Sequence, residues 1–296
     1  MESKRTWLVA ITAVALWSTV ATAFKLSLRH TSPVMLLFLA NVVSALFFLA
    51  WSILAGNIRA LVPANTKQWM ITAAMAVLSP FAYYLVLFRA YDLLPAQVAQ
   101  PLNYTWAITL SVMSVFFLGK KLGRAEIAGG LVAYGGVWLI CTPGESFEGG
   151  LSGEGIALAL GSTLLWALFW ILNTLDERKE VVTLGAAFVL SLPLTTAAAV
   201  YSGFEELSWQ TMTGGVYVGL FEMGVTFVLW AKAMRWARST AKVSALIFLS
   251  PFLSLVFIWL VLGEQIAWTS IAGLAVIVAG LLLQRLRKRR PTQSAQ

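Results

Sequence analysis

Glu222 places a carboxylate near the middle of a long apolar run, residues 211–233, between Gly219 and Gly224. A carboxylate in apolar surroundings must be protonated, pair with a cation, or bind a ligand or proton. We therefore expect Glu222 to bind substrate or protons. The structural alternative is an ion pair, for which Lys232 is the candidate partner.

A second polar group lies at the start of the apolar run 96–118, where Gln97, Gln100, Asn103 and Tyr104 fall within two to three helical turns. Amides in an apolar environment are costly unless they are paired or hydrated. The cluster therefore predicts the polar wall of a cavity. The alternative is hydrogen bonding between helices, which contributes about 0.6 kcal/mol on average in membranes.

Aromatic side chains recur at helical spacing in three of the apolar runs. The stripes are Trp17, Ala21 and Phe24; Tyr84, Phe88 and Tyr91; and Trp166, Trp170 and Asn173. We expect a substrate-facing surface, to which we add Tyr83 and Ser250, although helix packing explains Trp17 and Trp166 equally well. Four other tryptophans lie at the ends of runs, as in an interfacial belt: Trp7, Trp69, Trp209 and Trp268.

Three prolines, Pro80, Pro193 and Pro251, each stand about halfway along an apolar run. Proline removes a backbone hydrogen bond and kinks a helix, which leaves carbonyl groups free to face a cavity. We therefore expect these three positions to be hinges beside a cavity. A merely bent helix is the alternative, since proline is common in membrane helices.

The chemistry of an enzyme or a metal centre is missing from this sequence. With Cys141 as the one cysteine and His30 as the one histidine, neither an intrachain disulfide nor a Cys/His metal site can form. The zinc-protease motif HExxH and the nucleophile motif GxSxG are both absent. We expect no enzymatic activity and no cofactor.

The elements that carry these residues are expected to be membrane-spanning helices. Of the 296 residues, 59% are hydrophobic and 11% are charged, whereas a soluble domain has about 25% charged residues. A spanning helix needs about 20 apolar residues. Charge, Gly and Pro divide the chain into ten spans: 7–28, 34–54, 69–91, 96–118, 125–141, 154–174, 183–202, 211–233, 239–262 and 268–284.

The basic residues test this division, because an even number of spans puts both termini on one side. Only Arg29 and Arg89 fall in loops of the other side, and Lys25 lies inside the first span. The remaining Lys and Arg lie on the side of the termini: Lys4, Arg5, Arg59, Lys67, Lys120, Lys121, Arg124, Arg178, Lys179, Lys232, Arg235, Arg238, Lys242, Arg285, Arg287, Lys288, Arg289 and Arg290. The positive-inside rule places both termini in the cytoplasm and assigns the basic tail to anionic lipid, not to nucleic acid.

An internal repeat divides the chain into two halves, residues 1–145 and 146–296. Residues 118–136, LGKKLGRAEIAGGLVAYGG, match residues 262–280, LGEQIAWTSIAGLAVIVAG, including Gly129 with Gly273 and Gly136 with Gly280. Each half holds five spans, an odd number, so the second half begins on the opposite side of the membrane. We expect two inverted five-helix repeats around a central cavity, an architecture of many secondary transporters.

The chain resembles the drug/metabolite transporter superfamily and, within it, the ten-helix EamA type. The resemblance covers the whole chain and rests on the two five-helix halves, the sequence LGE at 262–264 and the Gly-containing fifth helix of each half. Residues 103–106, NYTW, are similar to the N-Y-x-W box of YddG-type amino-acid exporters. Two positions depart from the pattern: Ala107 stands where proline is typical, and Lys120 stands where the second half has Glu264.

The resemblance implies a secondary transporter of a bacterial inner membrane that exports amino acids, aromatic and other neutral ones, or related small metabolites. We expect small-molecule and lipid partners and no nucleic acid, with the oligomeric state left open. Two alternatives remain. One is an exporter of organic cations, which would have to use Glu222, and the other is a passive facilitator or channel.

Overall fold

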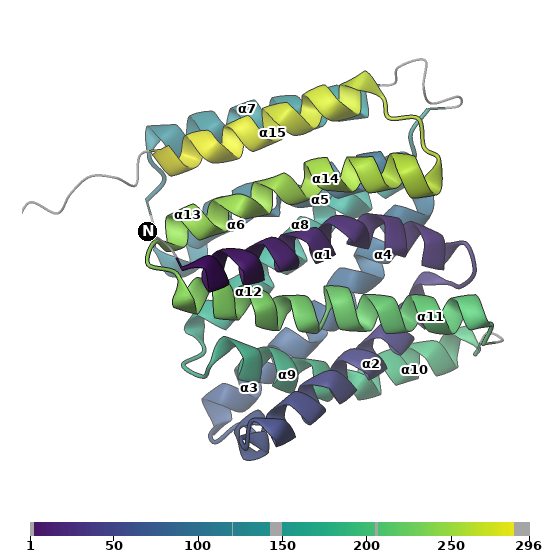
Figure 1. Cartoon of the computed structure of the whole chain (residues 1–296), viewed down its shortest axis with the longest axis vertical. Helices are drawn as coiled ribbons and strands as arrows, with labels where there is room; N and C mark the ends of the chain where they lie inside the picture. Colours follow the sequence, from purple (N-terminus) through teal and green to yellow (C-terminus); the bar gives the residue numbers. More distant parts are fainter. Residues whose placement is uncertain (1–2, 120, 143–149, 205–206, 287–296) are drawn as a thin grey trace, which may run out of the picture.

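The computed structural model describes residues 3–119, 121–142, 150–204 and 207–286, and these residues form helices and connections without any strand. The expected span ends agree with the observed helix ends to within three residues. Lys120, Arg287, Lys288, Arg289 and Arg290 lie outside the described residues. The helices run roughly parallel or antiparallel in one layered bundle (Figure 1).

The first half begins with two long uninterrupted helices, α1 (Lys4–Leu28) and α2 (Pro33–Leu54). Each begins at a serine whose hydroxyl accepts a hydrogen bond from a backbone N–H in the first turn, which satisfies a donor that the helix itself leaves free. The other elements of this half are η1 (Ile58–Leu61), α3 (Thr66–Ala76), η2 (Val77–Ala82), α4 (Tyr83–Leu93), α5 (Ala96–Tyr104), α6 (Trp106–Leu118) and α7 (Arg124–Cys141).

The second half begins with the uninterrupted helix α8 (Gly153–Leu175) and ends with the uninterrupted helix α15 (Trp268–Leu286), and the helical stretches between them are interrupted. Its other elements are α9 (Glu180–Leu190), α10 (Leu192–Ser202), α11 (Trp209–Tyr217), η3 (Val218–Glu222), α12 (Val225–Trp236), α13 (Thr240–Ser244), η4 (Ala245–Leu249), α14 (Ser250–Phe257) and η5 (Ile258–Leu262).

The interruptions lie at the predicted prolines and at two further positions. Ser79 has a non-helical backbone directly before Pro80, and both Pro193 and Pro251 stand in the first turn of a helix that follows a break. Gly224 is also non-helical, at φ −128° and ψ −93°, and separates η3 from α12. A further break, at Thr105, separates α5 from α6. The interruptions at Gly224 and Thr105 therefore lie within two residues of Glu222 and Asn103.

Eight helical stretches of the described chain are long and apolar enough to cross a membrane: Lys4–Leu28, Pro33–Leu54, Thr66–Leu93, Ala96–Leu118, Gly153–Leu175, Glu180–Ser202, Trp209–Trp236 and Lys242–Leu262. The two remaining expected spans correspond to α7, with 18 residues, and to the apolar part of α15, Trp268–Gln284. Both helices expose large apolar side chains, with Leu131 72% and Trp138 71% exposed. Helix length and composition thus agree with an integral membrane protein, and the count of ten spans stays a prediction.

α7 and α15 lie side by side along one edge of the bundle (Figure 1). Glycines let the two backbones touch: a Cβ added at Gly136 would lie 2.5 Å from the Gly273 carbonyl oxygen, and one at Gly129 would collide with the Gly280 carbonyl. Since Gly129 matches Gly273 in the repeat and Gly136 matches Gly280, the two contacts are exchanged when the halves are exchanged. Such reciprocity is the mark of a two-fold contact.

Candidate functional site

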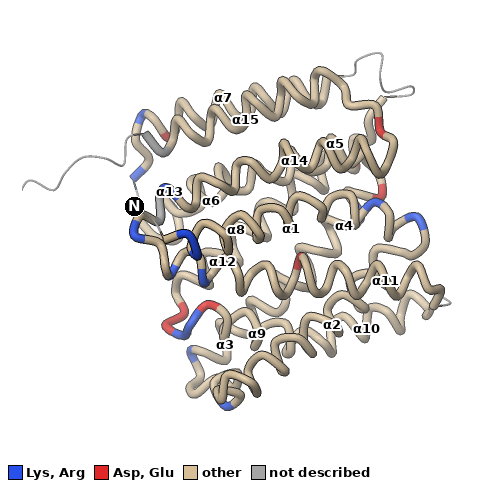
Figure 2. Tube along the Cα trace, in the orientation of Figure 1, with Lys and Arg blue, Asp and Glu red and all other residues tan. Residues whose placement is uncertain are grey.

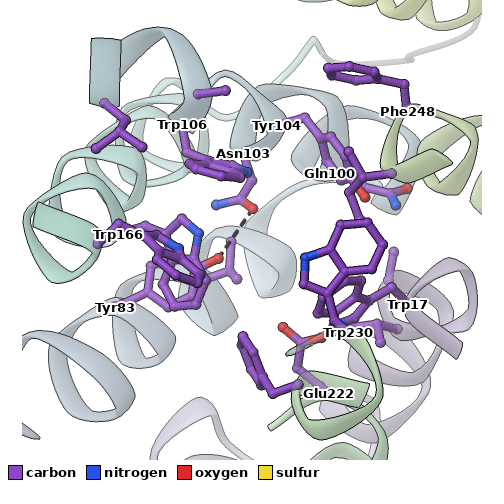
Figure 3. Close-up of a pocket in the computed structure, with 18 of the residues that line it drawn as sticks. Trp17, Tyr83, Gln100, Asn103, Tyr104, Trp106, Trp166, Glu222, Trp230 and Phe248 are labelled. Atoms are coloured by element: carbon purple, nitrogen blue, oxygen red, sulfur yellow. Dashed lines mark hydrogen bonds between the residues drawn. The ribbon is translucent and has the colours of Figure 1, made fainter. Parts of the chain in front are cut away.

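A cavity of about 340 Å³ lies in the middle of the bundle, and half of the described residues that line it are aromatic. Its volume is in the range of sites for small molecules. The described residues that line it come from α1, α4, α5, α6, α8, η3, α12, α13, η4 and α15, so both halves of the chain contribute. The side chains labelled in Figure 3 surround this space.

Glu222 is the one charged residue among the described residues that line the cavity. The hydroxyl of the fully buried Tyr84 donates a hydrogen bond of 3.1 Å to its Oε1, and the Trp17 ring lies next to the carboxylate (Figure 3). The alternative of an ion pair with Lys232 does not hold, because the Lys232 ammonium lies over the Trp51 ring, 4.4 Å from its centroid. The carboxylate is held by a neutral donor and faces the cavity.

Two groups of rings flank the carboxylate. Trp166 stacks on Tyr83, with centroids 4.5 Å apart, and on Phe169 at 5.1 Å. On the other side, Trp17 meets Trp230 edge to face at 5.5 Å. Figure 3 shows Trp17 and Trp230 next to Glu222, with Trp166 and Tyr83 across the cavity. Ring faces and edges are therefore presented to any molecule that reaches Glu222.

The α5 helix supplies the polar wall. Asn103 donates to the Ser162 hydroxyl at 3.0 Å and accepts from the Tyr83 hydroxyl at 3.3 Å, the contact drawn in Figure 3. Gln100 also lines the cavity, and its buried Oε1 has no hydrogen-bond partner. An orphaned buried acceptor is costly, so Gln100 is a natural partner for a donor on a ligand.

Eight of the ten candidate substrate-binding residues line the cavity: Trp17, Tyr83, Gln100, Asn103, Tyr104, Trp166, Trp170 and Glu222. The other two lie one layer behind it, Tyr84 bonded to Glu222 and Ser250 hydrogen-bonded to Tyr104. The lining also includes residues that the sequence reasoning did not select, among them Trp106, Phe227, Trp230 and Phe248.

Gln97 does not belong to the cavity wall, contrary to expectation. Its Oε1 accepts hydrogen bonds from the Ala267 backbone N–H at 2.8 Å and from the Ser270 hydroxyl at 3.1 Å, and its Nε2 donates to the Gln265 carbonyl. The amide therefore caps the start of α15. This partner lies about 170 residues away along the chain, so local sequence carries no sign of it.

The turn between α4 and α5 is held at both ends by charged side chains. Lys25 donates to the carbonyls of Tyr91 and Leu94 at 2.7 and 2.8 Å, where α4 ends. Glu264 accepts from the backbone N–H groups of Ala96 and Gln97 at 2.9 and 3.3 Å, where α5 begins. Each charge faces the helix end of opposite partial charge. We call this end of the bundle, away from the N-terminus in Figure 1, the distal end.

Aromatic packing continues this closure toward the cavity. Phe24 packs edge to face against Phe88 and Tyr91, with centroids 4.8 and 5.2 Å away. Phe88 is fully buried, while Phe24 and Tyr91 also line the cavity. The distal end of the cavity is thus covered by packed rings beneath the charged side chains.

The opposite, proximal end collects most of the described Lys and Arg residues (Figure 2). There Arg178 forms a buried pair with Asp176, 2.7 Å between Nη2 and Oδ2, and donates to the Thr72 hydroxyl. Although burial favours the neutral acid, the hydrogen bonds and charge of Arg178 hold the pKa of the Asp176 carboxyl below its usual value. The pair fixes the α8–α9 connection to α3.

Fold and site together describe an integral membrane protein with a central cavity. The EamA-like transporter family matches residues 4–142 and again residues 153–285, and the chain belongs to this family. A crystal structure matches with a TM-score of 0.66 at 23% identity, covering 97% of this chain and 100% of the other. At that identity the likeness shows the fold alone.

Several named relatives are similar over nearly the whole chain. The aromatic amino acid exporter YddG of Ancylobacter novellus is 26% identical over 300 residues, 98% of this chain and 100% of that protein. A probable amino-acid metabolite efflux pump of Salmonella typhimurium is 24% identical, with 95% of each chain covered. The uncharacterized transporter YvbV of Bacillus subtilis is 24% identical over 77% of this chain and 76% of its own length.

Proposed function

We propose that this protein exports small molecules that carry an amino group, namely aromatic and other neutral amino acids or related metabolites, across a bacterial inner membrane. The observation that carries the proposal is the central cavity, in which one carboxylate lies among aromatic rings and an unpaired amide oxygen. The carboxylate suits an ammonium group, and the rings suit an apolar side chain. Two relatives whose names describe export also support this proposal.

The mechanism we propose is alternating access between two inverted five-helix halves, residues 1–145 and 146–296. The repeated family match and the reciprocal glycine contacts of α7 with α15 support this division. Inverted halves can exchange conformations, which moves the opening of a central site from one side of the membrane to the other. Pro80, Pro193 and Pro251 would serve as hinges, because each adjoins an interruption of its helix.

The proposed orientation puts both termini in the cytoplasm and the distal end on the outside. The Lys and Arg gathered at the proximal end support it through the positive-inside rule. In this orientation the turn held by Lys25 and Glu264 closes the outer side of the cavity. Export then requires these contacts to break once substrate is bound.

A passive facilitator or channel is the main alternative mechanism, and counterflow separates the two. Proteoliposomes preloaded with unlabelled neutral amino acid should accumulate the labelled compound transiently above its equilibrium level, since a carrier exchanges one bound molecule for another. A channel would show only decay to equilibrium. Absence of any saturable flux across a panel of amino acids and amines would contradict the proposed function itself.

A further inference from the structure

The described lining of the cavity carries a negatively charged side chain and no positively charged one. Glu222 supplies a carboxylate, whereas the described lining includes no Lys, Arg or His. Two lysines on helices that also carry lining residues are engaged elsewhere, Lys25 with the Tyr91 and Leu94 carbonyls and Lys232 with the Trp51 ring. Lys4 and Lys242, on α1 and α13, do not line the cavity. No basic side chain of the described lining is therefore available to pair with an anionic group of a ligand.

Because of this imbalance, the cavity stabilises the ammonium group of a zwitterion but not its carboxylate. An ammonium group gains the Glu222 carboxylate, and it also gains the ring faces of Trp17 and Trp230, since cations are attracted to aromatic faces. A carboxylate in the same space would lose its water, meet no cation, and be repelled by Glu222 at low dielectric. The carboxylate of a free amino acid therefore weakens its binding in this cavity.

The unpaired hydrogen-bonding atoms also favour a ligand with N–H donors over one with a carboxylate. Gln100 Oε1 is an acceptor without a partner, and Asn103 already uses its amide on Ser162 and Tyr83. The available acceptors suit a ligand rich in N–H donors. Among the buried donors, the Trp170 indole N–H is without a partner and is a single neutral group, which cannot replace the hydration of a carboxylate.

We propose that the cavity selects aromatic or apolar amines that carry one positive charge and no free carboxylate over zwitterionic amino acids with the same side chain. The inference rests on the proposed export function. Of the two substrate groups proposed there, it favours the related metabolites that lack a carboxylate over the amino acids themselves. Glu222 is the residue that sets this preference.

The test compares three labelled compounds that share one phenyl side chain in counterflow: 2-phenylethylamine, phenylalanine and 3-phenylpropionate. Flux into protein-free liposomes is subtracted from each. We expect the amine to be carried at least tenfold faster than phenylalanine at equal low concentration, and 3-phenylpropionate not to be carried. Phenylalanine flux equal to or above that of the amine would overturn the inference and leave the proposed function standing. No protein-dependent flux of any of the three would overturn both.

Substitutions test whether Glu222 sets the preference for the amine. Glu222→Gln should remove the advantage of the amine, and Glu222→Asp, which keeps the charge, should restore part of it. Glu177→Gln makes the same chemical change at a side chain that is 85% exposed and should retain the preference in full. Binding measured in detergent by quenching of tryptophan fluorescence applies the same comparison to folded protein. An amine preference that persists in a folded Glu222→Gln variant would overturn the inference.

Discussion

Lys25 and Glu264 hold opposite ends of the same turn, the lysine at the C-terminus of α4 and the glutamate at the N-terminus of α5. They come from α1 and from the connection between η5 and α15, so a single turn ties together elements from both halves of the chain. Charges placed against the helix dipoles make each contact stronger than a neutral hydrogen bond. Separation of the halves at the distal end must break the Glu264 contacts, which join the second half to the first, whereas the Lys25 contacts lie within the first half.

We predict that Glu264→Gln shifts the protein toward a distally open state. A hydrogen bond to a charged group contributes about 1.5–3 kcal/mol, so its loss should raise the open population about tenfold or more. The measurement is the rate at which an impermeant thiol reagent labels a cysteine at Leu87, a cavity-lining residue, in a Cys141→Ala background. Lys67→Met, which breaks an exposed ion pair at the proximal end, should leave the rate unchanged. Equal rates in both variants would refute the closure role.

Gly136 and its neighbour Gly135 offer a matched pair on α7. A methyl group at Gly136 would lie 2.5 Å from the Gly273 carbonyl oxygen, whereas one at Gly135 has nothing within 4 Å. Gly136→Ala should therefore lower the unfolding temperature in detergent, because the backbones of α7 and α15 must separate. Gly135→Ala should raise it or leave it unchanged, since alanine stabilises a helix by about 0.5–1 kcal/mol relative to glycine. Equal shifts in both variants would mean that these helices do not touch as described.

Asp176→Asn should destabilise the protein at neutral pH by about 1–3 kcal/mol, because it leaves the buried Arg178 without its partner. The folded-state pKa of Asp176 is depressed below its ordinary value of 3.8. Its contribution is thus fully present above that pH and is lost as the pH falls further. Unfolding temperatures at pH 7 and near pH 3 should show the gap between wild type and variant closing on acidification. A gap that stays constant would exclude ionic pairing as its cause.

Trp166→Ala should reduce flux by at least tenfold at matched protein abundance, because Trp166 lines the cavity and stacks on Tyr83. Trp268→Ala is the control, since that side chain is 69% exposed at the start of α15. Transport in proteoliposomes normalised to folded protein makes the comparison. Similar losses in both variants would assign Trp166 to packing alone.

Much of the cavity could be predicted from sequence, because polar and charged residues are rare in apolar spans and therefore conspicuous. Glu222, Asn103 and Gln100 were found in this way, and the helical spacing of aromatics indicated Trp17 and Trp166. The positions of charged residues, Gly and Pro likewise predicted the helix ends to within three residues.

What could not be predicted depends on breaks and on distant partners. Trp106 and Trp230 follow the interruptions at Thr105 and Gly224, and a helical face cannot be extended across a break of unknown direction. Gln97 looked like cavity wall because its partners at Ala267 and Ser270 are remote in sequence. Lys25 was placed inside the first span by sequence, and its partners at the end of α4, the Tyr91 and Leu94 carbonyls, are likewise remote in sequence.

The most direct test of the central claim, that the cavity around Glu222 is the transport site, is substrate flux through Glu222→Gln in proteoliposomes. Glutamine keeps the shape and can still accept from Tyr84, but it cannot pair with an ammonium group. We predict normal folding and membrane insertion with flux of amino-group substrates reduced at least tenfold, while Glu177→Gln transports at the wild-type rate. Wild-type flux through folded Glu222→Gln would contradict the account.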